Sequence, residues 1–122
     1  MATGDDSVDI DNWTTQLRKG LLELCIVNLL AKGELYGYDL VKHLARIRGL
    51  VVTEGTIYPL LSRLRKMGIV TTRLVESPSG PARRYYALTP NGKRLRTTMN
   101  TYWGELMRGI EELLEESEAD HG

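Results

Sequence analysis

The first stretch of helical periodicity in the chain begins near Asn12 or Trp13. Apolar residues recur every three or four positions as far as Gly33, namely Trp13, Leu17, Leu21, Leu24, Val27 or Ile26, and Leu30. A second apolar side predicts that this helix is buried on more than one face. Residues 1–11 lack the pattern, so we expect a disordered tail there.

Two shorter helices are predicted to follow. The first ends at Gly49, and its apolar face consists of Leu40, Val41, Leu44 and Ile47. The second ends at Gly68, and its apolar positions are Ile57, Leu60, Leu61, Leu64 and Met67. Thr53 is a good N-cap for this second helix. Thr56 is the competing N-cap, because it would place Pro59 in the first turn, where proline is tolerated.

Two strand-like runs come next, at residues 69–76 and 83–88. The segment Ser-Pro-Ser-Gly-Pro-Ala at 77–82 separates them, which predicts a β-hairpin with a flexible tip. The dipeptide Thr89-Pro90 then provides an N-cap and a first-turn proline for a helix that runs to Glu118. The apolar positions of this last helix are Leu95, Met99, Trp103, Leu106, Ile110 and Leu113.

The order of these elements predicts a mainly α fold with a small β-hairpin. Three helices followed by a hairpin outline a winged helix-turn-helix, to which a long C-terminal helix is added. We expect a disordered acidic tail over residues 1–11, the winged helix-turn-helix over 12–89, a dimerisation helix over 90–118 and a short tail over 119–122. A chain of 122 residues has room for one such domain.

The apolar stripe on the last helix needs a partner. A winged helix of about 70 residues is too small to bury the whole stripe in a second layer. A second copy of the chain is the natural partner, and the alternative is that the helix folds back on its own domain. We expect the first and last helices of both chains to form the interface through Trp13, Leu17, Trp103, Leu106, Ile110 and Leu113.

Charge is distributed unevenly along the chain, although the formal net charge is zero. Residues 1–12 hold four acidic residues and no basic one, and residues 105–122 hold seven acidic residues and a single basic one. The segment 13–104 therefore holds fifteen basic against five acidic residues, a net charge of +10. A basic module of this kind is typical of nucleic-acid binding.

The third predicted helix carries the residues that we expect to read DNA. In a winged helix-turn-helix this helix enters the major groove. Its polar side consists of Thr56, Tyr58, Ser62, Arg63, Arg65 and Lys66, whose hydroxyls and charges suit base edges and phosphates. Any amphipathic helix has a solvated polar face, but here Glu54 is the only acid. Arg83 and Arg84 beside the hairpin tip add a basic contact for a groove or for phosphates.

Three runs of the sequence stand out as motifs. They are Leu-Tyr-Gly-Tyr-Asp-Leu at 35–40, Glu-Gly-Thr-Ile-Tyr-Pro-Leu-Leu-Ser-Arg-Leu at 54–64, and Arg-Arg-Tyr-Tyr-Ala-Leu-Thr-Pro-Asn-Gly at 83–92. In order and spacing they resemble the PadR-type transcriptional regulators, over residues 17–115 of this chain. The Gly-Thr-Ile-Tyr-Pro-Leu-Leu run is the specific one, because many winged-helix proteins end their wing on a sequence such as Leu-Thr-Pro-Asn-Gly.

The resemblance implies a homodimeric bacterial repressor that binds double-stranded DNA at a near-palindromic operator. The single C-terminal dimerisation helix is similar to that of the family's smaller subclass. By motif position, the residues implied to contact DNA are Thr56, Tyr58 and Pro59 on the recognition helix, Tyr38 at the start of the preceding helix, and Arg83 and Arg84 on the wing. Effectors vary across the family, so the motifs imply none.

Other classes of function receive no support from the sequence. Runs of the form Cys-x-x-C, His-Glu-x-x-His or Gly-x-x-x-x-Gly-Lys do not occur, so we expect no enzyme, no metal site and no cofactor. The lone Cys25 is expected to be a buried, inert thiol, and His43 a partly buried helix residue. An acidic N-terminus and the lack of an 18-residue apolar run predict a cytoplasmic protein with no membrane partner. A winged-helix adaptor that binds proteins instead of DNA is the remaining alternative, and the basic charge disfavours it.

Trp103 is the candidate residue for binding an effector. It lies where the apolar seam of the last helix begins, next to Tyr102 and Gly104. In a twofold dimer its copy is expected near the symmetry axis, and two facing indoles form a slot for a small planar aromatic molecule. The alternative is that Trp103 only fills the interface. Gly104 and Gly109 weaken the helix and favour a loosely packed region.

Overall fold

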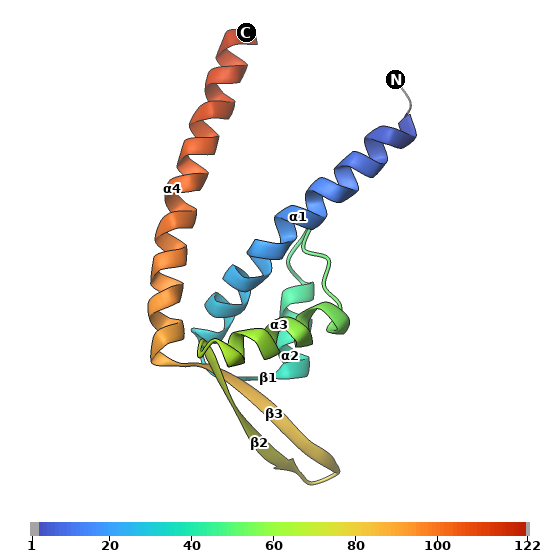
Figure 1. Ribbon diagram of the computed structural model, residues 1–122, viewed down its shortest axis with the longest axis vertical. Helices are drawn as coiled ribbons and strands as arrows, with labels where there is room; N and C mark the ends of the chain where they lie inside the picture. The colour runs from blue at the N-terminus through green and yellow to red at the C-terminus, as the bar shows by residue number, and fades with distance from the viewer. Residues whose placement is uncertain (1–2, 122) are drawn as a thin grey trace.

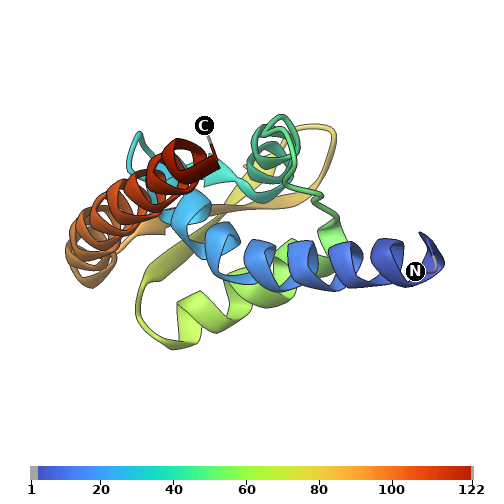
Figure 2. The same ribbon diagram turned by 90° about the horizontal axis from the view of Figure 1, so that it is seen from above.

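A computed structural model describes residues 3–121 of the chain, with side chains for residues 9–118. Its elements are α1 (Thr3–Leu30), β1 (Leu35–Tyr36), α2 (Gly37–Ala45), α3 (Glu54–Lys66), β2 (Val70–Ser77), β3 (Gly80–Leu88) and α4 (Pro90–His121). Helices α1 and α4 rise from a small body and diverge towards the chain ends, whereas the β2–β3 hairpin projects from the opposite end (Figures 1 and 2). The predicted fold class, a winged helix-turn-helix with a long C-terminal helix, is confirmed.

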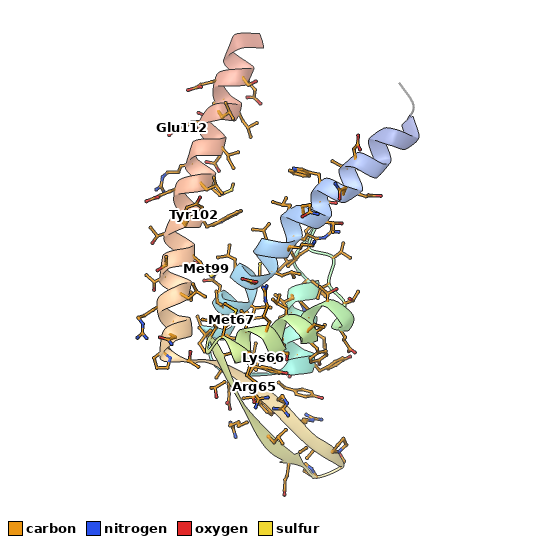
Figure 3. The ribbon with its side chains drawn as sticks, viewed as in Figure 1. Arg65, Lys66, Met67, Met99, Tyr102 and Glu112 are labelled. Atoms are coloured by element: carbon orange, nitrogen blue, oxygen red, sulfur yellow. The ribbon has the colours of Figure 1, made fainter. Side chains whose placement is uncertain are left out.

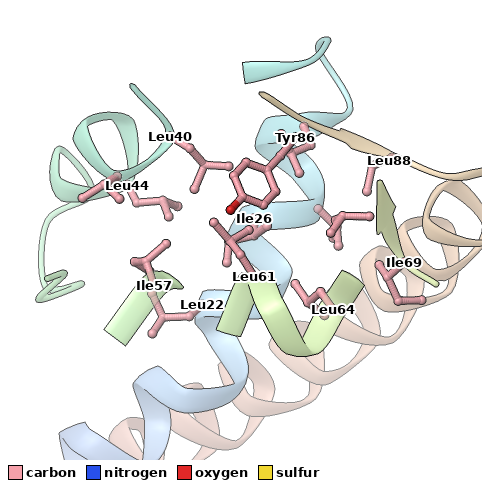
Figure 4. Close-up of a cluster of buried hydrophobic side chains, with 14 of the residues drawn as sticks. Leu22, Ile26, Leu40, Leu44, Ile57, Leu61, Leu64, Ile69, Tyr86 and Leu88 are labelled. Atoms are coloured by element: carbon pink, nitrogen blue, oxygen red, sulfur yellow. The ribbon is translucent and has the colours of Figure 1, made fainter. Parts of the chain in front are cut away.

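The hydrophobic core lies where α1, α2, α3 and the base of the hairpin meet (Figure 4). Its fully buried side chains are Ile26, Val27, Leu40, Leu44, Ile57, Leu61, Leu64 and Val70. Tyr86 and Leu88 of β3 close the core on the side of the sheet. Burying an aliphatic side chain of this size contributes about 1.5–3 kcal/mol, so the cluster fixes α3 firmly on the other two helices.

Helix α1 differs from the prediction at its start and in its buried face. It begins at Thr3, so the predicted start near Asn12 and the disordered tail over 1–11 are wrong for residues 3–11; residues 1–2 lie outside the described residues. The acidic sequence at the start of the helix complements the helix dipole, and no proline interrupts it. The buried side is Leu22, Ile26, Val27 and Leu30, whereas Trp13 and Leu17 of the predicted stripe are exposed.

Two local features of α2 and α3 decide between sequence alternatives. Thr53 is the N-cap of α3, because its side chain accepts a hydrogen bond from the Thr56 backbone N–H at 3.3 Å. Thr56 is therefore a first-turn residue and the alternative cap is wrong, although Pro59 lies inside the helix. Gly68 ends α3 with a φ of 76°, a left-handed conformation that glycine adopts without strain. His43 is exposed on α2 and Cys25 is half-buried on α1, so both burial predictions are wrong.

The sheet has three strands, in the order β1-β3-β2, and all pairs are antiparallel. β1 was not predicted, because a two-residue strand has no periodicity to detect; it pairs Leu35 with Tyr86 and Tyr36 with Tyr85. The hairpin turn is formed by residues 78–79 alone. The predicted flexible tip over 77–82 is therefore wrong, since ladder pairing continues to Ser77 and Gly80 across a bulge.

Helix α4 starts on the core and leaves it after about three turns. The Thr89 side chain is the predicted N-cap and accepts a hydrogen bond from the Gly92 backbone N–H at 3.0 Å. The helix continues to His121, so the predicted tail over 119–122 is wrong for residues 119–121. Gly122 lies outside the described residues. Within the described residues, neither α4 nor α1 has the length of apolar sequence that crossing a membrane requires.

Candidate nucleic-acid interface

One side of α3 is free of the core and carries the predicted contact residues. Ile57, Leu61 and Leu64 face inwards, whereas Thr56, Tyr58, Pro59, Ser62, Arg63, Arg65 and Lys66 are exposed. Figure 3 places Arg65 and Lys66 at the end of α3, beside the base of the hairpin. The polar face of this helix therefore looks out at the end of the molecule from which the hairpin projects.

Arg63 is set apart from the other exposed residues of α3. Its guanidinium forms an ion pair with Glu23 of α1, and the two side chains are 58% and 27% exposed. The pair ties α3 to α1, on the side where α3 is packed. The Arg63 side chain stays mostly exposed in this pair, and its predicted contact with DNA stays a prediction.

Tyr58 is held against the start of α2. A Cβ added to Gly37 would lie 3.1 Å from ring carbons of both Tyr58 and Tyr86, so a larger residue there would have to push both rings away by a few tenths of an ångström. Partial burial, followed by the nearby Glu54 carboxylate, raises the pKa of the Tyr58 phenol. The phenol therefore stays protonated at neutral pH and can donate as well as accept a hydrogen bond.

Tyr38 lies near enough to Tyr58 to influence the pKa of its phenol, and other tyrosines lie beside Tyr38. The ring of Tyr36 lies 6.3 Å from that of Tyr38 and 5.9 Å from that of Tyr85. Cations cover this group: Lys42 lies 5.5 Å above Tyr38 and Arg83 lies 5.0 Å above Tyr36. Sequence reasoning missed Tyr36, Tyr85 and Lys42, although the Tyr-x-Tyr spacing at 36–38 was a usable signal.

Arg83 and Arg84 lie within β3 and not in a loop, so they point to opposite faces of the hairpin. Arg83 stacks on Tyr36. Arg84 donates from Nη1 to the Thr72 hydroxyl at 3.0 Å, on the face that Tyr86 shares with the core. The two arginines therefore make separate contacts and do not form the paired tip that the sequence suggested.

The predicted dimerisation residues lie on the two diverging helices at the other end of the molecule, where most of them provide exposed apolar surface. On α1, Trp13 and Leu17 are 59% and 45% exposed, and on α4 Leu106, Ile110 and Leu113 are 40–62% exposed. Within the described residues these side chains belong to no core. The surface lies far along α1 and α4 from the hairpin (Figure 1).

Trp103 is half-buried and borders two hollows, one between α1 and α4 and one between α1 and the loop before α3. One hollow, of about 330 Å³, is lined mainly by Leu21, Leu24, Met99 and Tyr102. The other, of about 380 Å³, extends from Leu17 past Trp103 to the loop before α3. Met99 and Tyr102 project from α4 into the space facing α1 (Figure 3). The apolar contact between the two helices is therefore incomplete around Trp103.

Comparison with known proteins identifies the family. The model of the transcriptional regulator PadR-like family matches residues 26–98. A transcriptional regulator of Mycobacterium tuberculosis is 34% identical over 103 residues, which cover 83% of this chain and 86% of that protein. The X-ray structure of a PadR-like transcription factor from Bacteroides fragilis has a TM-score of 0.71 and 40% identity, covering 84% of this chain and 98% of that one.

A third relative is the Bacillus subtilis negative transcriptional regulator PadR, which is 33% identical over 76 residues, 61% of this chain and 42% of its own length. Its crystal structure in complex with operator DNA matches with a TM-score of 0.58 and 31% identity, covering 65% of this chain and 45% of that one. The match of the family model, residues 26–98, contains α3 and the hairpin, and this chain therefore belongs to the PadR-like family of transcriptional regulators.

Proposed function

We propose that the protein is a repressor that binds a near-palindromic DNA operator as a homodimer. The observation that carries the proposal is the exposed polar face of α3, flanked by the tyrosine group and by Arg84 of the hairpin. The negative regulator PadR of Bacillus subtilis binds operator DNA and supports this assignment. In this chain, residues 12–89 act as the DNA-binding unit and residues 90–118 as the dimerisation helix.

The charge distribution makes phosphate contacts the main source of affinity. If a dimer makes about 8 such contacts, the logarithm of the affinity falls with the logarithm of the salt concentration at a slope of about −7. The affinity is measured by electrophoretic mobility shift at several salt concentrations. The probe is an inverted repeat that the protein selects from a pool of random duplexes, and a scrambled duplex is the control. A slope flatter than about −2 would remove the electrostatic argument.

Base readout and positioning are assigned to different residues. Tyr58→Ala or Thr56→Ala is expected to reduce the discrimination between operator and scrambled DNA, because α3 reads base edges. Arg84→Ala is expected to weaken binding to both duplexes equally, because a wing arginine contacts phosphates or a degenerate minor groove. An unchanged specificity ratio in Tyr58→Ala means that α3 is not the reading helix.

The dimer is assigned to apolar residues of α1 and α4. The interface consists of the half-buried Trp103 and of Trp13, Leu17, Leu106, Ile110 and Leu113, whose exposure in one chain leaves apolar surface for a second copy. Twofold symmetry then places two recognition helices on successive half-sites of one DNA face.

A small planar aromatic effector is proposed at Trp103, where the apolar contact of α1 and α4 is incomplete. Its binding changes operator affinity only if its own affinity differs between two arrangements of the dimer. Quenching of tryptophan fluorescence by planar aromatic compounds is compared in the wild type and in Trp103→Leu, with Trp13 as the internal control. Equal quenching in Trp103→Leu, or operator affinity that stays unaltered with the compound bound, contradicts the effector site.

A further inference from the structure

A network of side-chain amides joins α1 to α4 below the apolar hollows. Asn28 Nδ2 donates to Asn100 Oδ1 at 2.8 Å, and Asn100 Nδ2 donates back to Asn28 Oδ1 at 2.9 Å. Asn28 Nδ2 also donates to the Leu24 carbonyl at 2.8 Å, and Arg96 Nε donates to Asn28 Oδ1 at 2.8 Å. The Asn28 amide is thus engaged at both its nitrogen and its oxygen, in a part-buried setting.

A second anchor holds the start of α4 on the end of α3. The Thr89 hydroxyl contacts the Gly68 carbonyl at 2.5 Å, and the Thr89 backbone N–H donates to the Ile69 carbonyl at 3.0 Å. A Cβ on Gly92 would lie 2.1 Å from the Ile69 carbonyl oxygen, so the first turn of α4 lies directly on this backbone. The Thr89 anchor and the Asn28 network hold α4 at two points, Thr89 and Asn100, which are 11 residues apart.

Beyond Trp103 the direction of α4 depends on what holds its base, namely these two points and the packing of Leu95 and Met99 on the core. Leu106, Ile110 and Leu113 are 43%, 40% and 62% exposed, so packing within the chain does not steer this half of the helix. The nearby apolar contact between α1 and α4 leaves a hollow of about 330 Å³. Loose apolar packing allows helices to slide and tilt, whereas paired amides allow only one register.

We propose that the Asn28–Asn100–Arg96 network sets the separation of the two recognition helices in the dimer, and with it the half-site spacing that the protein accepts. This inference rests on the proposed homodimer. From Asn100 to Ile110 the helix rises about 15 Å, so a tilt of about 10° moves the seam by about 2.6 Å. Twofold symmetry doubles the displacement to about 5 Å, more than the spacing of about 3.4 Å between base pairs.

The test uses the double variant Asn28→Leu/Asn100→Leu, which replaces the amides by apolar groups of similar size. Thr101→Leu is the matched control, because Thr101 is an exposed neighbour on the same helix. All proteins carry Cys25→Ala and Ser62→Cys, and a spin label on position 62 of α3 reports the distance between the recognition helices by pulsed EPR. The wild-type background and the control are expected to give one narrow distribution, and the double variant one at least twice as wide.

The second readout is the tolerance for half-site spacing, measured with the unlabelled proteins. The inverted repeat selected by the wild type is lengthened or shortened by one and by two base pairs. When the half-site spacing changes by one base pair, the operator affinity of the wild type and of Thr101→Leu is expected to fall at least tenfold. The affinity of the double variant is expected to fall less than threefold. If the double variant does not fold, Arg96→Met is measured in the same way, because it removes one arm of the network and leaves the amide pair.

Each outcome separates the inference from the proposed function. No interspin distance in the wild-type background, or no selected sequence, overturns the proposed dimeric operator binding. A dimer whose distance distribution and spacing tolerance are the same in the double variant, or in Arg96→Met where that variant is used, overturns the role of the network. Asn28→Asp replaces the Nδ2 donor by an oxygen that faces two acceptors, the Leu24 carbonyl and Asn100 Oδ1, and it is expected to widen the distribution as the double variant does; a narrow one also contradicts the inference.

Discussion

The core around α3 and the outer half of α4 have the same helical spacing of apolar residues and opposite environments. Ile57, Leu61 and Leu64 on α3 are at most 1% exposed, whereas Leu106 and Ile110 on α4 are 43% and 40% exposed. Periodicity therefore identifies the apolar face of a helix but does not say what covers it. In α3 the cover is the rest of the chain, and in α4 the proposed cover is a second copy.

The two regions also differ in what positions them. The α3 helix is fixed by a core that surrounds its inner face, by the Thr53 cap and by the ion pair of Arg63 with Glu23. The outer half of α4 is held from its base, through Thr89, the Asn28 network and the packing of Leu95 and Met99 on the core. Under the proposed function, the packed body reads DNA and the projecting helix meets a second copy, so that readout and assembly belong to separate parts of one small chain.

The largest effect is expected from substitutions that disrupt the proposed dimer contact on the outer half of α4 and leave the core intact. Leu106→Glu or Ile110→Glu places a carboxylate in the seam of both copies, with no base in the stripe to pair with it. We expect a folded monomer, a dimer dissociation constant raised at least about 100-fold, and no operator binding. Sedimentation velocity and circular dichroism check this, with Thr101→Glu as a control off the stripe. An intact dimer in both seam variants would mean that the stripe faces its own domain.

The next effect tests the core side of the comparison. Leu61→Ala removes a fully buried side chain and is expected to lower the free energy of unfolding by about 3 kcal/mol. Leu114→Ala deletes the same atoms at a position that is 58% exposed, and its effect is expected to be below about 0.5 kcal/mol in the monomeric Leu106→Glu background. Urea unfolding monitored by circular dichroism measures both. Equal losses would show that the outer half of α4 is buried within the chain.

Two glycines of α4 give a smaller effect, of opposite sign in the two regions. Gly92→Ala brings a methyl group onto the Ile69 carbonyl and is expected to destabilise the protein by about 2 kcal/mol. At Gly109 a Cβ meets nothing within 4 Å, so Gly109→Ala is expected to stabilise the helix by about 1 kcal/mol. Thermal unfolding of both variants is the measurement. A stabilising Gly92→Ala would show that the start of α4 is free to move off the core.

The sequence predicted the fold well because its elements are marked by local signals. Apolar spacing located the helices, Thr53 and Thr89 marked two starts, and the glycine at position 68 marked an end. The errors fall where local signals are absent. β1 exists only because Tyr85 and Tyr86 of β3 supply it with hydrogen-bonding partners, and a strand formed by a distant partner has no pattern of its own.

The candidate site was predicted in its residue types but only partly in its geometry. The exposed Thr56, Tyr58 and Ser62 follow from helical spacing. The ion pair of Arg63 with Glu23 does not follow from helical spacing, because it depends on how two helices cross. The Asn28 network could not be predicted from the sequence either, because Asn28 and Asn100 are 72 residues apart and each has the pattern of an ordinary polar position.

The smallest effect concerns the ion pair of Glu34 with Arg73 at the base of the wing. The Arg73 guanidinium donates from Nε to Glu34 Oε2 at 2.9 Å, and this hydrogen bond lowers the pKa of the Glu34 carboxyl below its ordinary value of 4.5. A carboxyl with a depressed pKa in the folded state contributes stability above the pKa of the unfolded state. The contribution is lost as the pH falls below 4.5 and through the pKa of the folded state.

The effect is expected to be small because solvent reaches both side chains, which are 61% and 36% exposed for Arg73 and Glu34. Carboxyl NMR titration of Glu34 is compared in the wild type and in Arg73→Gln. The midpoint of the Glu34 titration is expected below 4.5 in the wild type and nearer to that value in the variant. Dimerisation is expected to be unchanged, because the hairpin lies at the opposite end of the molecule from the outer half of α4. Identical midpoints would show that the pair does not hold in solution and that β1 is joined to the wing by its backbone and ring contacts alone.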